Sequence, residues 1–119
     1  MTTQEVADRF VEMARSGQLD SCYTELFHQD AVAYEMEGMP NHITKGVDNL
    51  IAKSAEYNKN IKEFHGFDIS DPVVAPGFFS VYMMIDTTNQ EGKRQKGEEI
   101  CVYEVKDGKI VSERFFYQT

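Results

Sequence analysis

The amino-acid sequence predicts an α+β domain in which helices lie across one face of a curved sheet. Apolar residues recur at helical spacing in three segments before Ile61, whereas the segments after it have the composition of β-strands. Short turn signals separate those later segments, so consecutive strands are expected to pair antiparallel. No repeat or linker divides the chain, and we expect one domain over residues 1–119.

The first two helices are marked by their ends. Thr2 and Glu5 have the spacing of a capping box, and Gly17 is typical of the position just beyond a helix. Asp20 is placed to cap a short second helix. The apolar residues expected to face the core are Val6, Phe10, Met13 and Ala14 in the first helix, and Cys22, Tyr23, Leu26 and Phe27 in the second.

A short strand over 30–37 and a third helix over about 46–58 are expected next. The strand carries Val32, Tyr34 and Met36, and a Gly- and Pro-containing loop follows it. The inner stripe of the third helix is predicted to be Val47, Leu50, Ile51 and Ser54.

Four longer strands complete the prediction. Residues 61–70 and 78–88 form two of them, separated by the turn signals Asp71-Pro72 and Pro76-Gly77. Residues 97–117 form the other two, joined at Asp107-Gly108.

Charge and composition exclude several classes of function. Lys and Arg number 12 and Asp and Glu 20, which gives a net charge of −8 that disfavours nucleic acid and anionic membrane surfaces as partners. Cys22 and Cys101 lie far apart and are interpreted as small buried hydrophobes. The N-terminus lacks the layout of a signal peptide and no apolar run is long enough to span a bilayer, so a cytoplasmic protein is expected.

No cofactor or metal site is expected from the sequence motifs. The chain has no Gly-rich phosphate loop and no nucleophile–base motif. Its three histidines, His28, His42 and His65, lack the spacing of a metal site.

Alternation along the last two strands places acids among apolar neighbours. One face carries Gly97, Glu99, Cys101 and Tyr103 on the first strand, and Val111, Glu113, Phe115 and Tyr117 on the second. Burial would raise the pKa of Glu99, whereas a one-residue slip in register would turn Glu98 inward instead. Glu113 is equally consistent with a structural ion pair, a hydrogen bond to a buried Tyr or a ligand contact. If Glu99 and Glu113 lie opposite each other, a shared proton is expected.

In its order of elements the chain resembles the nuclear transport factor 2-like superfamily and, within it, the SnoaL-like proteins. The resemblance covers essentially the whole chain and rests on caps and turns. They are Gly17 between two helices, Phe27-His28-Gln29-Asp30-Ala31-Val32, Lys45-Gly46 before the third helix, and Asp107-Gly108-Lys109-Ile110 before the last strand. It implies a cone of three helices wrapped by a strongly bent, mostly antiparallel sheet, with a cavity at the wide end. Activity varies widely among such proteins.

Similarity to ketosteroid isomerase, a member of that superfamily, implies candidate catalytic residues. Glu35, five residues after Asp30, corresponds to its general base. Glu99 corresponds to its second acid, a carboxyl that stays protonated in an apolar site and donates to an oxyanion. Glu113 is assigned as a modulator. Phe10 stands where that enzyme has a catalytic Tyr and therefore supplies no hydroxyl.

Similarity to limonene epoxide hydrolase implies no shared chemistry, because Tyr82, Met84 and Phe115 occupy its three catalytic positions. The opposite face of the strand over 78–88 is equally apolar, so either face can be the inner one. The expected ligand-binding residues are Phe10, Met36, Tyr82, Met84, Cys101, Phe115 and Tyr117.

Two functions remain open at this stage. The first is binding of a small hydrophobic or cyclic molecule, with cofactor-free proton transfer such as isomerisation, cyclisation or dehydration. The second is a non-catalytic, homodimeric ligand-binding or protein-interaction module. The resemblance implies dimerisation through the outer sheet face, where Ile100, Val102 and Phe116 supply apolar area.

Overall fold

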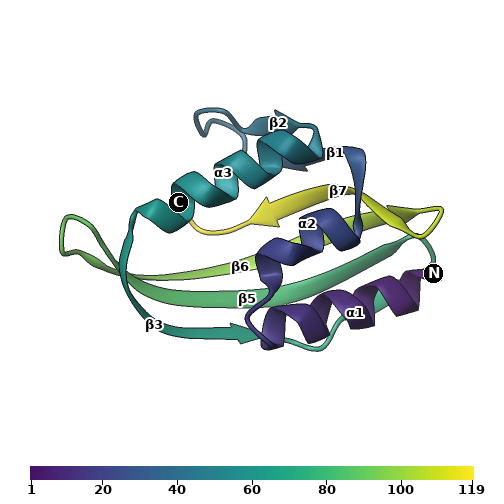
Figure 1. Cartoon of the computed structure of the whole chain (residues 1–119), viewed down its shortest axis with the longest axis horizontal. Helices are drawn as coiled ribbons and strands as arrows, with labels where there is room; N and C mark the ends of the chain where they lie inside the picture. The colour runs from purple at the N-terminus through teal and green to yellow at the C-terminus, as the bar shows by residue number, and fades with distance from the viewer.

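The frame of the molecule is one strongly curved seven-stranded sheet (Figure 1), seen in a computed structural model that describes residues 1–119. Its strands are β1 (Phe27–Tyr34), β2 (Ile43–Lys45), β3 (Ile61–Ile69), β4 (Val73–Ala75), β5 (Phe78–Asn89), β6 (Arg94–Lys106) and β7 (Lys109–Phe116). They run in the order β2-β1-β7-β6-β5-β3, with β4 paired to β5. Every pair is antiparallel except β1 with β7, which confirms the predicted mostly antiparallel sheet.

The helices lie on one face of the sheet, as Figure 1 shows. They are α1 (Thr3–Arg15), a 3₁₀ turn (Leu19–Ser21), α2 (Cys22–Glu25) and α3 (Val47–Lys59). The helix α1 contacts β3, β4, β5 and β6, whereas α3 contacts β1, β2 and β3. The α+β class with three helices packed on a curved sheet is therefore confirmed. No helix combines the length and the apolar character that crossing a membrane requires.

The predicted capping box at the start of α1 is present. The Thr2 hydroxyl accepts from the Glu5 amide at 3.1 Å, and the Glu5 carboxylate accepts from the Thr2 amide at 2.9 Å. At the other end Gly17 has a φ of 76°, which residues with a side chain rarely adopt. Both ends of α1 are thus fixed by local chemistry that the sequence displays.

Two boundaries differ from the prediction. The helix α2 ends at Glu25, with the Leu26 amide making its last helical bond to the Cys22 carbonyl, and β1 begins at Phe27. The strand β1 then stops at Tyr34, so Glu35 and Met36 lie just beyond it. On α3 only Leu50 of the predicted stripe is buried, and Ile51 is exposed.

The core fills the space between α1 and the concave sheet face. An aromatic cluster joins Phe10 of α1 to Phe79 of β5 and Tyr103 of β6. Phe79 and Tyr103 stack with centroids 4.8 Å apart, and Phe10 lies 4.7 Å from Tyr103. This cluster anchors α1 and closes one end of the interior, and the other end lies beneath α2 and α3.

Replacing Phe79 by Ala should lower the free energy of unfolding by about 3–5 kcal/mol, because a fully buried ring would leave a cavity. Phe64, which is 61% exposed, is the matched control, and Phe64→Ala should change that free energy by less than about 0.5 kcal/mol. Urea denaturation measures both. Equal losses in the two variants would contradict this assignment of the core.

Candidate functional site

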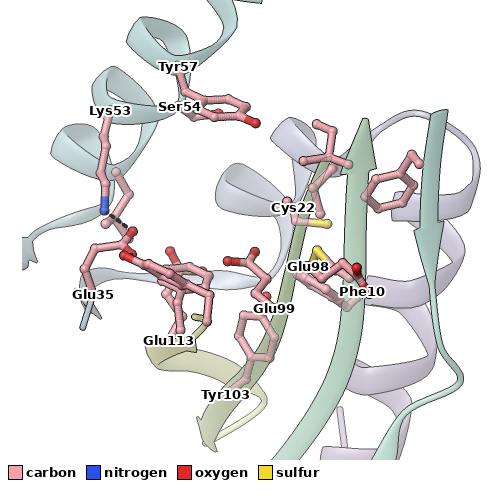
Figure 2. Close-up of a pocket in the computed structure, with 18 of the residues that line it drawn as sticks. Phe10, Cys22, Glu35, Lys53, Ser54, Tyr57, Glu98, Glu99, Tyr103 and Glu113 are labelled. Atoms are coloured by element: carbon pink, nitrogen blue, oxygen red, sulfur yellow. Dashed lines mark hydrogen bonds and ion pairs between the residues drawn. The ribbon is translucent and has the colours of Figure 1, made fainter. Parts of the chain in front are cut away.

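A cavity of about 620 Å³ opens between the helices and the concave face of the sheet, and 13 of its 22 lining residues are hydrophobic. Helix α2, helix α3, β5, β6 and β7 all contribute walls. Figure 2 shows Glu35 and Lys53 on one side, Cys22 and Phe10 on the other, and the carboxyl of Glu99 directed into the space between. The volume lies in the range of small-molecule sites.

Glu35 is held at both of its carboxylate oxygens. The Lys53 ammonium on α3 lies 2.8 Å from Oε1, and the Tyr117 hydroxyl donates to Oε2 at 2.8 Å. The Glu35 amide donates to the His42 carbonyl at 2.7 Å, which fixes the backbone just beyond β1. Three segments that are far apart in the sequence therefore orient one carboxylate at the cavity wall.

Glu113 is the most deeply buried acid, with only 4% of its surface exposed. Burial raises the pKa of Glu113 from 4.5 to about 8, because water no longer solvates the charged form. The charges of Glu35 and Glu99 raise this pKa further, whereas Lys53 and a hydrogen bond with Tyr23 lower it. At neutral pH Glu113 therefore carries a proton that it can donate.

Glu99 is the third acid that faces the cavity. Burial is also the main cause that raises the pKa of Glu99, and the Cys101 thiol donates to its carboxylate with S and O 3.5 Å apart. Its neighbour Glu98 is exposed and accepts a hydrogen bond from the Tyr82 hydroxyl at 2.8 Å. The strand thus turns Glu99, rather than Glu98, toward the interior.

Strand register keeps Glu99 and Glu113 apart. Glu113 lies opposite Tyr103, and Phe115 lies opposite Cys101, so Glu99 precedes the partner of Glu113 by four residues on β6. At about 3.3 Å per residue, the two acids are offset by roughly 13 Å along the sheet. The two acids are therefore not directly opposed, and the condition set for a shared proton is not met.

The predicted ligand-binding residues divide into two groups. Phe10, Phe115 and Tyr117 line the cavity, whereas Met36 and the fully buried Cys101 do not. Tyr82 and Met84 also fall outside the lining.

The inner face of β5 is shifted by one residue from the expected one. Met83 and Ile85 line the cavity, and Tyr82 faces away to bond Glu98. The outer face of β5 is half-buried, and its side chains are apolar like those of the inner face. Alternation of apolar and polar residues therefore does not show which face is the inner one.

The sequence profile of the SnoaL-like domain matches residues 1–117. The chain belongs to this family. A structure from Mesorhizobium loti, proposed to be a SnoaL-like polyketide cyclase and also labelled a carbohydrate phosphatase, is 31% identical, with a TM-score of 0.92 over 98% of this chain and 100% of that one. None of the curated proteins matches the sequence.

More distant structures share the fold alone. A proposed isomerase from Bacillus subtilis is 22% identical, with a TM-score of 0.73 over 99% of this chain and 90% of that one. A protein of unknown function with a cystatin-like fold from Xanthomonas campestris is 14% identical, with a TM-score of 0.80 over 100% of this chain and 92% of that one.

Sequence reasoning places Leu50 and Ser54 of α3 on an inner stripe but misses Lys53 and Tyr57, which also line the site of this SnoaL-like protein. Leu50, Lys53, Ser54 and Tyr57 all line the cavity, at the i, i+3, i+4, i+7 spacing of one helix face. That spacing is visible from Leu50 onward, but a lysine is normally solvated and so gives no signal of an inward role. Tyr23 of α2, predicted for the core, also borders the cavity. No three His, Cys, Asp or Glu side chains are arranged to hold a metal ion.

The free energy of unfolding of this SnoaL-like protein should fall as the pH rises from 4.5 to about 8. Folded Glu113 keeps a proton that the unfolded chain releases in this window, so raising the pH favours the unfolded chain. The slope approaches about 1.4 kcal/mol per pH unit for one such group. Chemical denaturation at several pH values measures it.

Glu113→Gln should flatten most of this dependence, since an amide does not titrate. Glu91→Gln, in an exposed loop, is the matched control and should keep the wild-type slope. A slope that survives in Glu113→Gln would assign the proton to another group.

Proposed function

We propose that this SnoaL-like protein binds a small, cyclic and largely apolar molecule in its cavity and moves a proton on it without a cofactor, as isomerases, cyclases and dehydratases do. The observation that carries this proposal is the pair formed by Glu35, an ion-paired carboxylate, and Glu113, a proton-bearing acid, on the walls of one apolar cavity. Two carboxyl groups held in opposite protonation states are the arrangement that acid–base chemistry needs.

In this mechanism Glu35 is the general base. Its two oxygens each accept one hydrogen bond, and a carboxylate retains further lone pairs that can take a proton from carbon. The Lys53 ammonium and the Tyr117 hydroxyl fix its orientation, which reduces the reorganisation that proton transfer requires.

The acid is Glu113, with Glu99, whose pKa is also raised by burial, as a second candidate. As the base removes a proton next to a carbonyl, negative charge develops on the carbonyl oxygen. A neutral carboxyl buried in an apolar wall stabilises that charge by donating a hydrogen bond. The burial of Glu113 favours it over Glu99, to which the isomerase resemblance gave this role.

The charges on the lining favour a neutral ligand. Four acids and two lysines border the cavity: Glu35, Glu98, Glu99, Glu113, Lys53 and Lys96. Lys53 is already engaged by Glu35, so no free cation faces the inner acids. A phosphate ester would meet like charge there, which disfavours the phosphatase label carried by the Mesorhizobium relative.

A probe of base catalysis tests the proposal without knowledge of the natural ligand. The flat, neutral compound 5-nitrobenzisoxazole loses a proton from carbon to the base, its N–O bond breaks, and a coloured cyanophenolate forms. We expect turnover by the wild-type protein and a loss of about 10²-fold or more in kcat/KM in Glu35→Gln.

Glu37→Gln is the matched control, because Glu37 is exposed and lies two residues from Glu35. It should retain wild-type turnover. Glu113→Gln should lower kcat while leaving probe binding measurable. Equal turnover in Glu35→Gln and wild type would remove Glu35 as the base.

A second candidate function, the non-catalytic homodimeric module, is favoured by the outer face of the sheet. Phe116, Ile100 and Tyr82 are register partners across β7, β6 and β5, and Ile100 and Phe116 are 47% and 48% exposed. A continuous apolar row of this kind suits contact with a second copy of the chain.

Ile100→Glu should convert a wild-type dimer into a monomer, because it places a charge in the centre of that row. Sedimentation velocity measures the change. Val73→Glu, at the 74% exposed Val73 of β4, should leave the dimer intact. A monomeric wild-type protein would contradict the dimer.

A further inference from the structure

Lys53 connects the helical layer to the site. It projects from α3, and its Nζ reaches Oε1 of Glu35, beyond the end of β1, at 2.8 Å. The same ammonium lies 5.9 Å from the ring centre of Phe115 on β7. Lys53 is 40% exposed at its side chain and Glu35 only 21%, so the pair lies at the edge of the cavity with the acid on the inner side. Figure 2 shows this bond across the cavity wall.

The charge of Lys53 also reaches the two inner acids. It lowers the pKa of Glu113, as the largest influence on that group after burial, and it lowers the pKa of Glu99. The other lysine of the lining, Lys96, lies in register with Asp86 on β5 and is exposed. Lys53 is therefore the cation that all three cavity acids share.

We propose that Lys53 is a positioning residue for the reaction at this site: its bond to Glu35 orients the base and places a positive charge beside it, and that charge extends to the inner acids. This inference rests on the proposed proton transfer for its kinetic consequence, but its electrostatic consequence holds without turnover.

The physical reason is charge repulsion. Three carboxyl groups that face one apolar cavity oppose one another's ionisation, as the mutual influence of Glu35, Glu99 and Glu113 indicates. One bonded cation stabilises a negative charge on its own partner most strongly. Tyr117 orients Glu35 too, but its hydroxyl is neutral, so Lys53 alone places a positive charge beside the base.

Proton transfer would then redistribute this interaction. When Glu35 takes a proton from the ligand, its carboxylate becomes neutral and the ligand becomes the anion. The Lys53 cation, which remains at the cavity wall, then stabilises the new negative charge. The Lys53 charge thus stabilises the Glu35 carboxylate before the transfer and the anionic ligand after it.

Three variants separate this role from simple packing. Lys53→Met removes the charge and keeps a flexible chain of similar reach, and Lys53→Arg keeps the charge. Lys59→Met is the matched control, because Lys59 lies on the same helix and pairs only with Glu56 at the surface, at 3.5 Å. Circular dichroism and the unfolding midpoint show that each variant is folded.

The first readout is the titration of Glu113, followed by carbon NMR of its carboxyl group. The groups that face Glu113 are Cys22 and Tyr23 from α2, Glu35 beyond β1, Lys53 from α3, and Glu99, Cys101 and Tyr103 from β6. The charge of Lys53 lowers the pKa of Glu113, so its removal should raise the titration midpoint of Glu113.

The midpoint of Glu113 should move upward in Lys53→Met and stay in place in Lys53→Arg and Lys59→Met. An unchanged midpoint in Lys53→Met would overturn the proposal. This measurement needs no substrate.

The second readout is the pH dependence of 5-nitrobenzisoxazole conversion. In Lys53→Met the acidic limb of the kcat profile should move to higher pH and kcat at neutral pH should fall about tenfold, with KM little changed. Lys53→Arg should restore both. A profile that stays in place, or a loss confined to KM, would show that Lys53 only shapes the pocket. If the wild-type protein does not convert the probe, the proposed function fails on that probe, and the Glu113 titration still decides the role of Lys53.

Discussion

Burial of the Glu113 carboxyl is the constraint on which the concave face of this sheet depends. A carboxyl group in an apolar wall is stable only when it is neutral, or when a cation or hydrogen-bond donors compensate its charge. Here the hydrogen bond with Tyr23 and the charge of Lys53 stabilise the carboxylate in part. Burial outweighs them, so the carboxyl group is protonated at neutral pH. A group of this kind lowers stability at high pH and has no packing advantage over Leu or Met. Its position in the wall of an apolar cavity is what supports the proposed chemistry.

The base side of the cavity depends on three segments that meet only in the folded protein. Lys53 comes from α3, Glu35 from the residue beyond β1, and Tyr117 from the end of the chain. The parallel pairing of β1 with β7 brings the last two together, because it aligns Ala33 with Glu113. A single exception to antiparallel order in the sheet therefore assembles the site.

The two faces of the sheet support different functions. The inner face carries the acids and the cavity, whereas the outer face carries the row through Tyr82, Ile100 and Phe116. Membership of the SnoaL-like family is compatible with either a catalytic cavity or a non-catalytic homodimeric module, because the fold hosts many activities. The charged groups of the inner face are what make proton transfer the stronger proposal.

The sequence by itself determined the α+β class and the ends of α1, and it favoured the inward parity of β6 that the structure shows. Capping residues, turn dipeptides and alternation act over a few residues, so they can be recognised from the sequence without knowledge of the fold. The inward direction of Glu99 follows from Cys101 and Tyr103, which share its parity and are buried. Only the tertiary structure decided the face of β5, the end of β1 and the role of Lys53. Both faces of β5 are apolar, and a lysine has no reason to turn inward until a carboxylate from another segment lies within reach. The offset between Glu99 and Glu113 also depends on strand register, which local sequence does not encode.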